Sequence, residues 1–256
     1  MAMIGEWLYN EASSGTTPTE LHDSSPGDPN DLPITYTSTA AWAAIAAGRG
    51  LGLGTLGTAG AISDPITTGN KVIDALNGSK TLTWEIVGNF TGFPGVSGGT
   101  VCDVLAQSPA VDSQCGIYPA GNTVNWDIWI GAGDALAPAS FFAKPSAVGV
   151  HVVHVTLNSA EVAANDRTKA YIDAARQTVT DQNGIPLDFQ LTYTLVSNIL
   201  QGLFSDGTFG ITGTIYYCSL WDEELSPAVI TTRAAGLLQN NDRDPGLISP
   251  GMMCFA

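Results

Sequence analysis

Short apolar segments that alternate with polar residues recur along this chain, and they constrain its fold more than any other feature. Alternation with a period of two places successive side chains on opposite faces of a β-strand, and many short strands separated by turns are typical of sandwiches and barrels. The sequence therefore predicts an all-β protein. The expected strands cover residues 82–87, 124–130, 149–157, 169–172, 189–196 and 214–221.

Turn signals lie between these segments and favour tight antiparallel hairpins. Glycine after asparagine or aspartate tolerates the positive φ angles that such turns require. These dipeptides occur at positions 77–78, 183–184 and 206–207. With 29 glycines in 256 residues, the chain has enough turn residues for one large two-sheet sandwich.

Helical pattern is scarce. Ser226 is expected to cap a helix, and Pro227 suits its first turn. Residues 39–47 are rich in alanine and form a second candidate, although nine residues make only a marginal helix. We therefore expect one or two short helices beside the sheets.

The charge of the chain excludes one class of partner. Lys and Arg number nine against 24 Asp and Glu, which gives a formal net charge of -15. Such a charge repels phosphate backbones, so nucleic acid is not an expected partner. No apolar run is long enough to span a bilayer, and residues 1–9 lack the pattern of an export signal. This fits folding in the cytoplasm, or a piece from which a signal has been removed.

The C-terminal segment, residues 239–256, is expected to be an extension of a domain formed by residues 1–238. It ends in an apolar cluster that contains Met252, Met253 and Phe255. Because exposed apolar side chains are unfavourable in water, this cluster should dock on the sandwich or on a neighbouring subunit, as in a homo-oligomer. These three residues are the candidate assembly residues.

Three groups of residues resemble the laminin-G-like family. The segment 5–11, with Glu11 and the later Asp23, is similar to the opening strand and turn of that family. Residues 151–157 look like its central strand, and residues 169–173 look like its Leu-Tyr-Val-Asp-Gly hairpin. Here Ala174 stands in place of the glycine, so the turn after Asp173 is expected to be wider than usual. Residues 209–230 resemble the final strand and closing helix.

This resemblance implies a concanavalin A-like, laminin-G-like jelly roll, an all-β sandwich of two antiparallel sheets. Relatives often hold Ca²⁺ with acidic side chains, which supply the oxygen ligands that this cation prefers. The resemblance therefore makes Asp23, Asp28 and Asp31 the candidate calcium ligands. A solvated acidic loop without an ion is the alternative.

Catalytic motifs are not evident in the sequence. Gly52, Gly54 and Gly57 spell a dinucleotide fingerprint, but the expected strand and helix do not flank them. His151 and His154 have odd spacing in a strand, so they should point to opposite faces and not share a metal. Glycosidases of this superfamily use paired carboxylates, and no Glu-x-Asp-x-x-Glu run occurs. We therefore expect a chain that is not an enzyme.

Binding of a carbohydrate is easier to support from the residues. Aromatic rings offer flat faces to sugars, and carboxylates accept hydrogen bonds from hydroxyl groups. Trp126, Asp127 and Trp129 form the densest such group, and Glu85, alone in its strand, completes the candidate ligand-binding set. Period-two alternation places Asp127 with Trp129 on one face and Trp126 with Ile128 on the other. One tryptophan can thus be core and the other exposed.

Two functions follow as expectations. The first is a surface assembly or attachment protein, such as a phage virion component that decorates a capsid or belongs to a tail. The alternative is a lectin-like module of a secreted or cell-surface protein. The expected partners are other subunits or glycans at a virion or extracellular surface, and insertion into a membrane is not expected.

Overall fold

A computed structural model gives the fold. It describes residues 2–8, 20–27, 31–36, 51–53, 60–66, 71–92, 102–106, 113–119, 125–132, 138–145, 149–181, 183–192, 197–201 and 212–239. Within these residues the protein is mostly β, with two antiparallel sheets, so the predicted fold class is confirmed.

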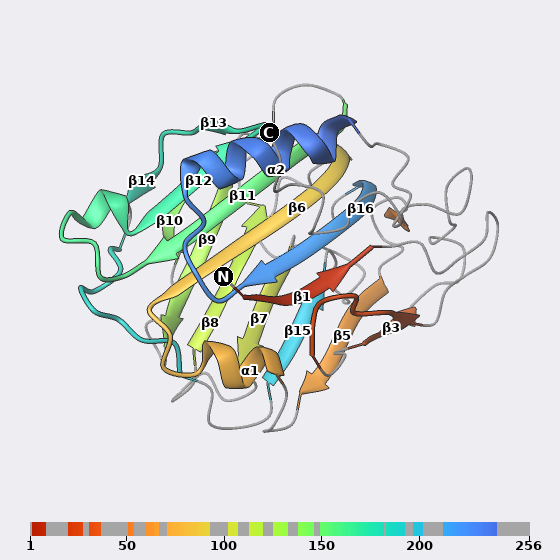
Figure 1. Ribbon diagram of the computed structural model, residues 1–256, viewed down its shortest axis with the longest axis horizontal. Helices are drawn as coiled ribbons and strands as arrows, with labels where there is room; N and C mark the ends of the chain where they lie inside the picture. Colours follow the sequence, from red (N-terminus) through yellow and green to blue (C-terminus); the bar gives the residue numbers. More distant parts are fainter. Residues whose placement is uncertain are drawn as a thin grey trace.

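The first sheet has seven strands among the described residues (Figure 1). Its path runs through β1 (Met3–Trp7), β16 (Thr212–Trp221), β6 (Thr81–Gly92), β11 (His151–Asn158), β12 (Thr168–Ile172) and β13 (Ala175–Arg176). The short strand β4 (Leu51–Leu53) also pairs with β16. The strands near the two ends of the described chain, β1 and β16, are therefore direct neighbours.

The second sheet has nine strands among the described residues. Its order is β14 (Thr180–Asp181), β10 (Pro138–Ala143), β9 (Asn125–Ala132), β8 (Ser113–Pro119), β7 (Cys102–Ala106), β15 (Ser197–Gln201), β5 (Gly60–Ile66), β3 (Leu32–Tyr36) and β2 (Glu20–Leu21). Consecutive strands β7 to β10 form a meander.

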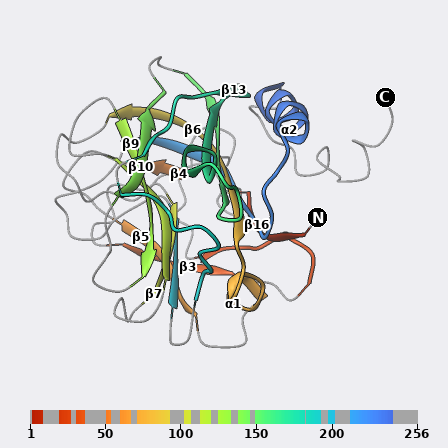
Figure 2. The same cartoon turned by 90° about the vertical axis from the view of Figure 1, so that its left-hand side faces the viewer.

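The core lies between the sheets. Alternate residues of β6 and β11, including Trp84 and Val155, face alternate residues of β9 and β10 in one apolar cluster. Trp126 and Phe142 pack edge to face, with ring centroids 5.9 Å apart. Figure 2 shows the sheets as successive layers, with helix α2 beside the seven-stranded sheet on the side away from the second sheet.

Helix α2 (Pro227–Gln239) confirms the helix predicted at Ser226 and Pro227. Ser226 Oγ accepts a hydrogen bond of 3.4 Å from the Val229 amide. The helix packs Ala234 and Leu237 onto Val87, Val152 and Tyr217 of the sheet. Because both faces of this sheet are covered, six consecutive residues of strand β11 are buried.

Two further helical segments are short. Helix α1 (Lys71–Leu76), which the sequence did not predict, buries Val72, Ile73 and Leu76 at one end of the sandwich. The 3₁₀ turn η2 spans Ala164–Asp166. The second predicted helix, at residues 39–47, lies outside the described residues. No helix of the described part is both long and apolar enough to cross a membrane.

The turn after Asp173 differs from the prediction. Ile172 pairs directly with Ala175, so only Asp173 and Ala174 lie between the two strands. Their φ angles are 51° and 68°, which are typical of a tight type I′ turn. The turn is therefore not wider than usual, and Ala174 takes a conformation that favours glycine.

Two other local predictions have different outcomes. The strand expected at residues 189–196 is not present in its described part, residues 189–192, and the neighbouring strand is β15. The division at residues 238 and 239 remains a prediction, because helix α2 ends at Gln239 and the residues beyond it lie outside the described part.

Candidate functional site

A row of polar side chains crosses the seven-stranded sheet beneath α2. Glu6, Ser219, Glu85, His154 and Tyr171 occupy paired positions on β1, β16, β6, β11 and β12. Residues paired directly across antiparallel strands share one face of the sheet. The pairing thus gathers polar groups from residues far apart in the sequence.

Glu85 lies at the centre of this row and is fully buried. Its carboxylate accepts hydrogen bonds from Arg233 Nε at 2.7 Å, from the same guanidinium's Nη2, and from Ser219 Oγ at 2.9 Å. His154 Nε2 lies 2.7 Å from the carboxylate. Arg233 belongs to α2, so this buried ion pair joins the helix to the sheet.

Electrostatics keep Glu85 ionised. Burial alone would raise the pKa of its carboxyl, but the Arg233 guanidinium and the contact with His154 outweigh burial and hold that pKa well below its ordinary value. The same attraction raises the pKa of Arg233 against the opposing effect of burial. Both charges of the pair are therefore present at neutral pH.

Three neighbours complete this network. Tyr217 donates a 2.9 Å hydrogen bond to Glu6 Oε1 and accepts one of 3.0 Å from Arg233. Trp221 Nε1 donates to Ser219 Oγ at 3.0 Å, and Arg233 lies 4.7 Å from the centroid of the Trp221 ring. Burial raises the pKa values of both Tyr217 and Glu6.

This placement removes Glu85 from the candidate ligand contacts. A ligand reaches its carboxylate only if α2 moves, and three protein side chains already contact it. The imidazoles of His151 and His154 contact different carboxylates, that of Asp173 at 2.7 Å and that of Glu85 at 2.7 Å. The network acts as a structural anchor for α2.

Strand β9 carries the other predicted ligand contacts. Trp126 is fully buried in the core, so it is removed from the set for the same reason as Glu85. Asp127 is half-buried on the opposite face. Trp129 lies in β9, but its side chain is outside the described part. Of the four predicted ligand residues, Asp127 is the one that the structure describes and leaves partly accessible.

The register of β9 brings aromatic residues beside Asp127. Asp127 pairs with Tyr118 of β8 on one side and with Phe141 of β10 on the other. Phe141 is half-buried and pairs in turn with Thr180 of β14. Asp127, Phe141 and Thr180, which we call the Asp127 row, lie on the face of the nine-stranded sheet opposite to Trp126. The sequence did not indicate Tyr118, Phe141 or Thr180, because only the register brings them together.

The predicted calcium ligands separate into different environments. The side chain of Asp23 is fully buried; its Oδ1 accepts bonds from the amides of Glu6 and Ser25 and from Ser25 Oγ, and its Oδ2 lies 2.7 Å from Lys71 Nζ. Those donors occupy the carboxylate, so Asp23 has a structural role. Asp28 lies outside the described residues.

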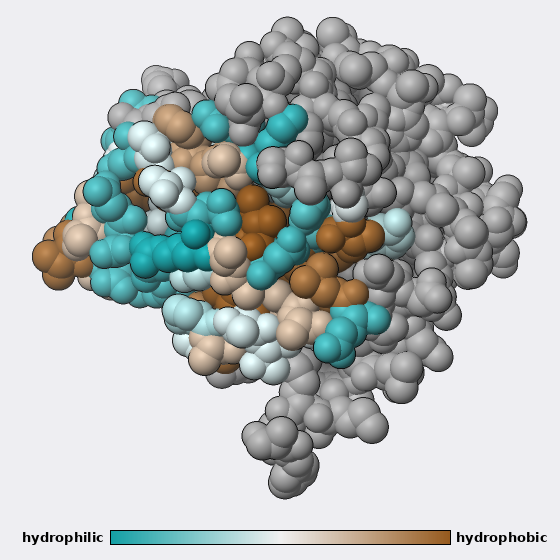
Figure 3. Space-filling model, turned by 90° about the horizontal axis from the view of Figure 1, so that it is seen from above, coloured by the Kyte–Doolittle hydropathy of each residue, from teal (hydrophilic) through white to brown (hydrophobic). Residues whose placement is uncertain are grey.

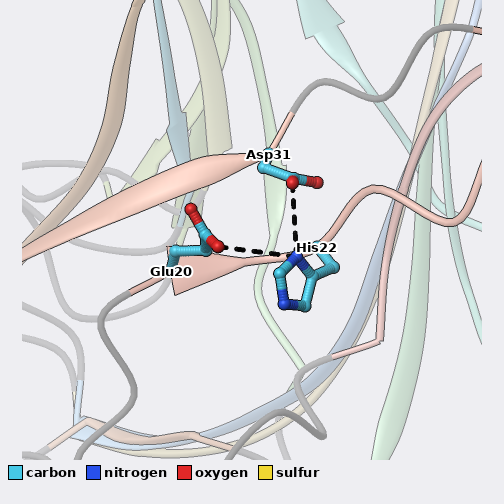
Figure 4. Close-up of side chains that lie close together, drawn as sticks. All are labelled: Glu20, His22 and Asp31. Carbon is cyan, nitrogen blue, oxygen red and sulfur yellow. Dashed lines mark hydrogen bonds and ion pairs between the residues drawn. The ribbon is translucent and has the colours of Figure 1, made fainter.

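Asp31 instead belongs to a group that the sequence did not predict (Figure 4). Its Oδ2 lies 3.2 Å from His22 Nδ1, and Glu20 Oε1 lies 3.7 Å from the same nitrogen. One ligand atom from each residue lies within 4.8 Å of the others. All three side chains are at least one-third exposed. The predicted metal ligands included Asp31 but neither Glu20 nor His22, and binding of a cation here remains a prediction.

The described part of the surface seen from above combines apolar and polar residues. Brown and teal residues are interspersed over the described part of the view in Figure 3. Val162 and Leu187 are the exposed large apolar residues of the described part. The candidate assembly residues Met252, Met253 and Phe255 lie outside it, so their role remains a prediction.

Comparisons with known proteins agree with the architecture. No family model and no curated protein sequence matches this chain. Among solved structures, it is similar to domain 4 of AbnA, a GH43 extracellular arabinanase from Geobacillus stearothermophilus, in complex with arabinotriose. The TM-score is 0.58 at 15% identity, over 91% of this chain and 98% of that one.

Two other neighbours are parts of larger chains. A Trypanosoma rangeli sialidase in complex with 2,3-difluorosialic acid has a TM-score of 0.60 at 14% identity, over 94% of this chain and 33% of the sialidase. The binding domain of botulinum neurotoxin serotype D/C VPI 5993 has a TM-score of 0.56 at 10% identity, over 92% and 52%. The three neighbours define the class of fold, a two-sheet β-sandwich, and the assignment to the laminin-G-like family remains a prediction.

These neighbours correct one prediction. The chain was expected not to be an enzyme because it lacks a run of paired carboxylates, but structures that share its fold belong to an arabinanase and to sialidases. The missing motif is therefore insufficient to exclude catalysis. The likeness shows the fold alone and assigns no reaction to this chain.

Proposed function

We propose that this chain is a glycan-binding β-sandwich domain that attaches its bearer to a carbohydrate surface. The observation that carries the proposal is the Asp127 row, in which a half-buried carboxylate lies in register beside the half-buried ring of Phe141. Aromatic rings stack on the apolar faces of sugars, and a carboxylate accepts hydrogen bonds from sugar hydroxyl groups. Thr180 adds a hydroxyl position at the end of the row.

The comparisons support this chemistry. The arabinanase domain that spans nearly the same length was solved with arabinotriose, and the toxin neighbour is described as a binding domain. Attachment through a glycan suits either of the two roles expected from the sequence, a virion component or a lectin-like module of a secreted or cell-surface protein. Both roles place the domain where glycans are displayed.

A glycan array followed by calorimetry tests the proposal. We expect arabino-oligosaccharides, sialylated glycans or another glycan class to be retained, and Asp127→Asn and Phe141→Ala each to weaken binding of the retained glycan at least tenfold. Asp74→Asn and Leu187→Ala are the matched controls, because both side chains are exposed and lie away from the Asp127 row. Release of sugar from the bound glycan, measured in the same samples, separates binding from turnover.

Three results would overturn the proposal. The first is an array on which no glycan is retained. The second is unchanged affinity in both Asp127 row variants while their melting temperatures equal that of the unaltered protein. The third is equal loss of affinity in the control variants.

A further inference from the structure

We propose that Glu20, His22 and Asp31 form a binding site for a divalent transition-metal ion of the zinc class. The site lies where β2 pairs with β3, at the end of the nine-stranded sheet. It is separate from the Asp127 row, so binding of a metal ion here does not depend on glycan binding. It also replaces the calcium site expected from Asp23, Asp28 and Asp31.

The distances between the donor atoms are the first argument for a metal site. Zinc bonds to nitrogen and oxygen are about 2.0–2.2 Å long, so two donors of a tetrahedral site lie about 3.3–3.6 Å apart. His22 Nδ1 lies 3.2 Å from Asp31 Oδ2 and 3.7 Å from Glu20 Oε1. Both separations are close to the edge of such a tetrahedron, and small rotations of exposed side chains bring them to it.

The backbone explains why the three donors meet. Glu20 and His22 are two residues apart at β2, so both side chains point to one face of the strand. Leu21 pairs with Leu32, which places His22 opposite Asp31 in the antiparallel register. In Figure 4 the two carboxylates approach the same ring nitrogen from different strands.

A second layer of contacts fixes Asp31. Its Oδ1 accepts a 2.8 Å hydrogen bond from the Asp23 amide. Asp23 is itself held by Lys71 and by backbone amides, so the position of that donor is fixed. Orienting contacts of this kind are common around metal ligands, because they hold a carboxylate in one rotamer and leave its second oxygen for the ion.

The donor set selects the class of metal. One imidazole and two carboxylates suit zinc and similar transition ions, whereas calcium prefers six to eight oxygen donors. The side chains of Glu20, His22 and Asp31 are 47%, 60% and 35% exposed. Solvent can therefore supply the remaining ligand.

A direct ion pair between protonated His22 and the carboxylates is the competing explanation, and metal titration separates the two. Protein treated with chelator and dialysed is titrated with Zn²⁺ by calorimetry, with Ca²⁺ as comparison. We expect one equivalent of Zn²⁺ to bind, a rise in melting temperature that chelator reverses, and at least tenfold weaker binding of Ca²⁺. Co²⁺ should give the visible absorption of a tetrahedral complex.

Variants locate the ion. His22→Ala should weaken Zn²⁺ binding at least tenfold, and Glu20→Gln should have a smaller effect in the same direction. His151→Ala is the matched control, because His151 contacts one carboxylate, that of Asp173, in a pair outside this site. The proposal is overturned if millimolar Zn²⁺ produces no heat or melting shift, if His22→Ala binds Zn²⁺ as tightly as the unaltered protein, or if His151→Ala alone abolishes binding.

Discussion

At the scale of single residues, the polar row beneath α2 contains carboxyl groups with opposite behaviour. The pKa of Glu85 is lowered because Arg233 and His154 outweigh burial, whereas the pKa of Glu6 is raised chiefly by burial. Glu6 accepts a hydrogen bond from Tyr217, whereas Glu85 accepts two from the Arg233 guanidinium. The two glutamates therefore contribute to stability with opposite dependence on pH.

Glu6→Gln tests this difference. A carboxyl whose folded pKa is raised contributes most below its ordinary value of 4.5, and that contribution is lost as pH rises through the folded pKa. The amide keeps an acceptor for Tyr217 and carries no charge, so the free energy of unfolding at pH 7 should rise relative to the unaltered protein and the difference should vanish near pH 4. Urea denaturation at pH 7 and near pH 4 measures the two free energies of unfolding. Equal destabilisation at both pH values would contradict it, and Asp74→Asn, which changes an exposed carboxylate, is the control.

Ala174→Gly should stabilise the hairpin between β12 and β13. Ala174 has a φ of 68°, a left-handed conformation that costs an alanine about 1–2 kcal/mol. Glycine removes that strain but loses more entropy on folding, so the expected net gain is about 0.5–1 kcal/mol in thermal or chemical denaturation. Ala175→Gly, one residue later in β13, is the control and should lower stability. If both variants are less stable, the packing of the Ala174 methyl group outweighs the backbone strain at Ala174.

At the scale of elements, α2 is held by an apolar face and by one ion pair. Removing one member of a buried pair leaves an uncompensated charge, which costs about 3–5 kcal/mol. Arg233→Met should therefore destabilise strongly, and Glu85→Leu with Arg233→Met should cost less than the sum of the single changes. Arg176→Met, which removes an exposed pair with Asp166, should have a much smaller effect on stability.

The ion pair of Glu85 with Arg233 should also affect how stability depends on pH in acid. Since the folded pKa of Glu85 lies below its ordinary value of 4.5, its contribution is present above pH 4.5 and is lost as pH falls toward the folded pKa. The unaltered protein should lose stability more steeply below pH 4.5 than Arg233→Met does. Parallel acid titration curves for the two proteins would contradict the assignment.

How far the sequence predicts these elements depends on the range of the interactions. Local alternation predicted the strands around Glu85 and Asp127, and a local cap predicted α2 at Ser226. No local pattern indicates that Arg233 meets Glu85, because the two are 148 residues apart in the sequence. The Asp127 row depends likewise on the register of three strands. Asp31 was found from its acidic loop, whereas Glu20 and His22 required the pairing of β2 with β3.

At the scale of the whole molecule, charge is the dominant long-range term. A net charge of -15 produces self-repulsion, which salt screens over a Debye length of about 10 Å at 0.1 M. The melting temperature should therefore rise between about 10 mM and 150 mM NaCl in the presence of chelator. A fall would instead mean that screened ion pairs, such as Lys169 with Glu224, contribute more than the repulsion.

The pairing of β1 with β16 has a consequence for biosynthesis. Residues of β1 leave the ribosome well before their strand partner, which ends at Trp221 and follows more than two hundred residues later. At about 5–20 residues per second, β1 waits on the order of tens of seconds with Ile4 and Trp7 exposed to solvent. The seven-stranded sheet therefore closes only after most of the chain has been translated, and a chaperone that shields the nascent N-terminal segment should raise the yield of folded protein.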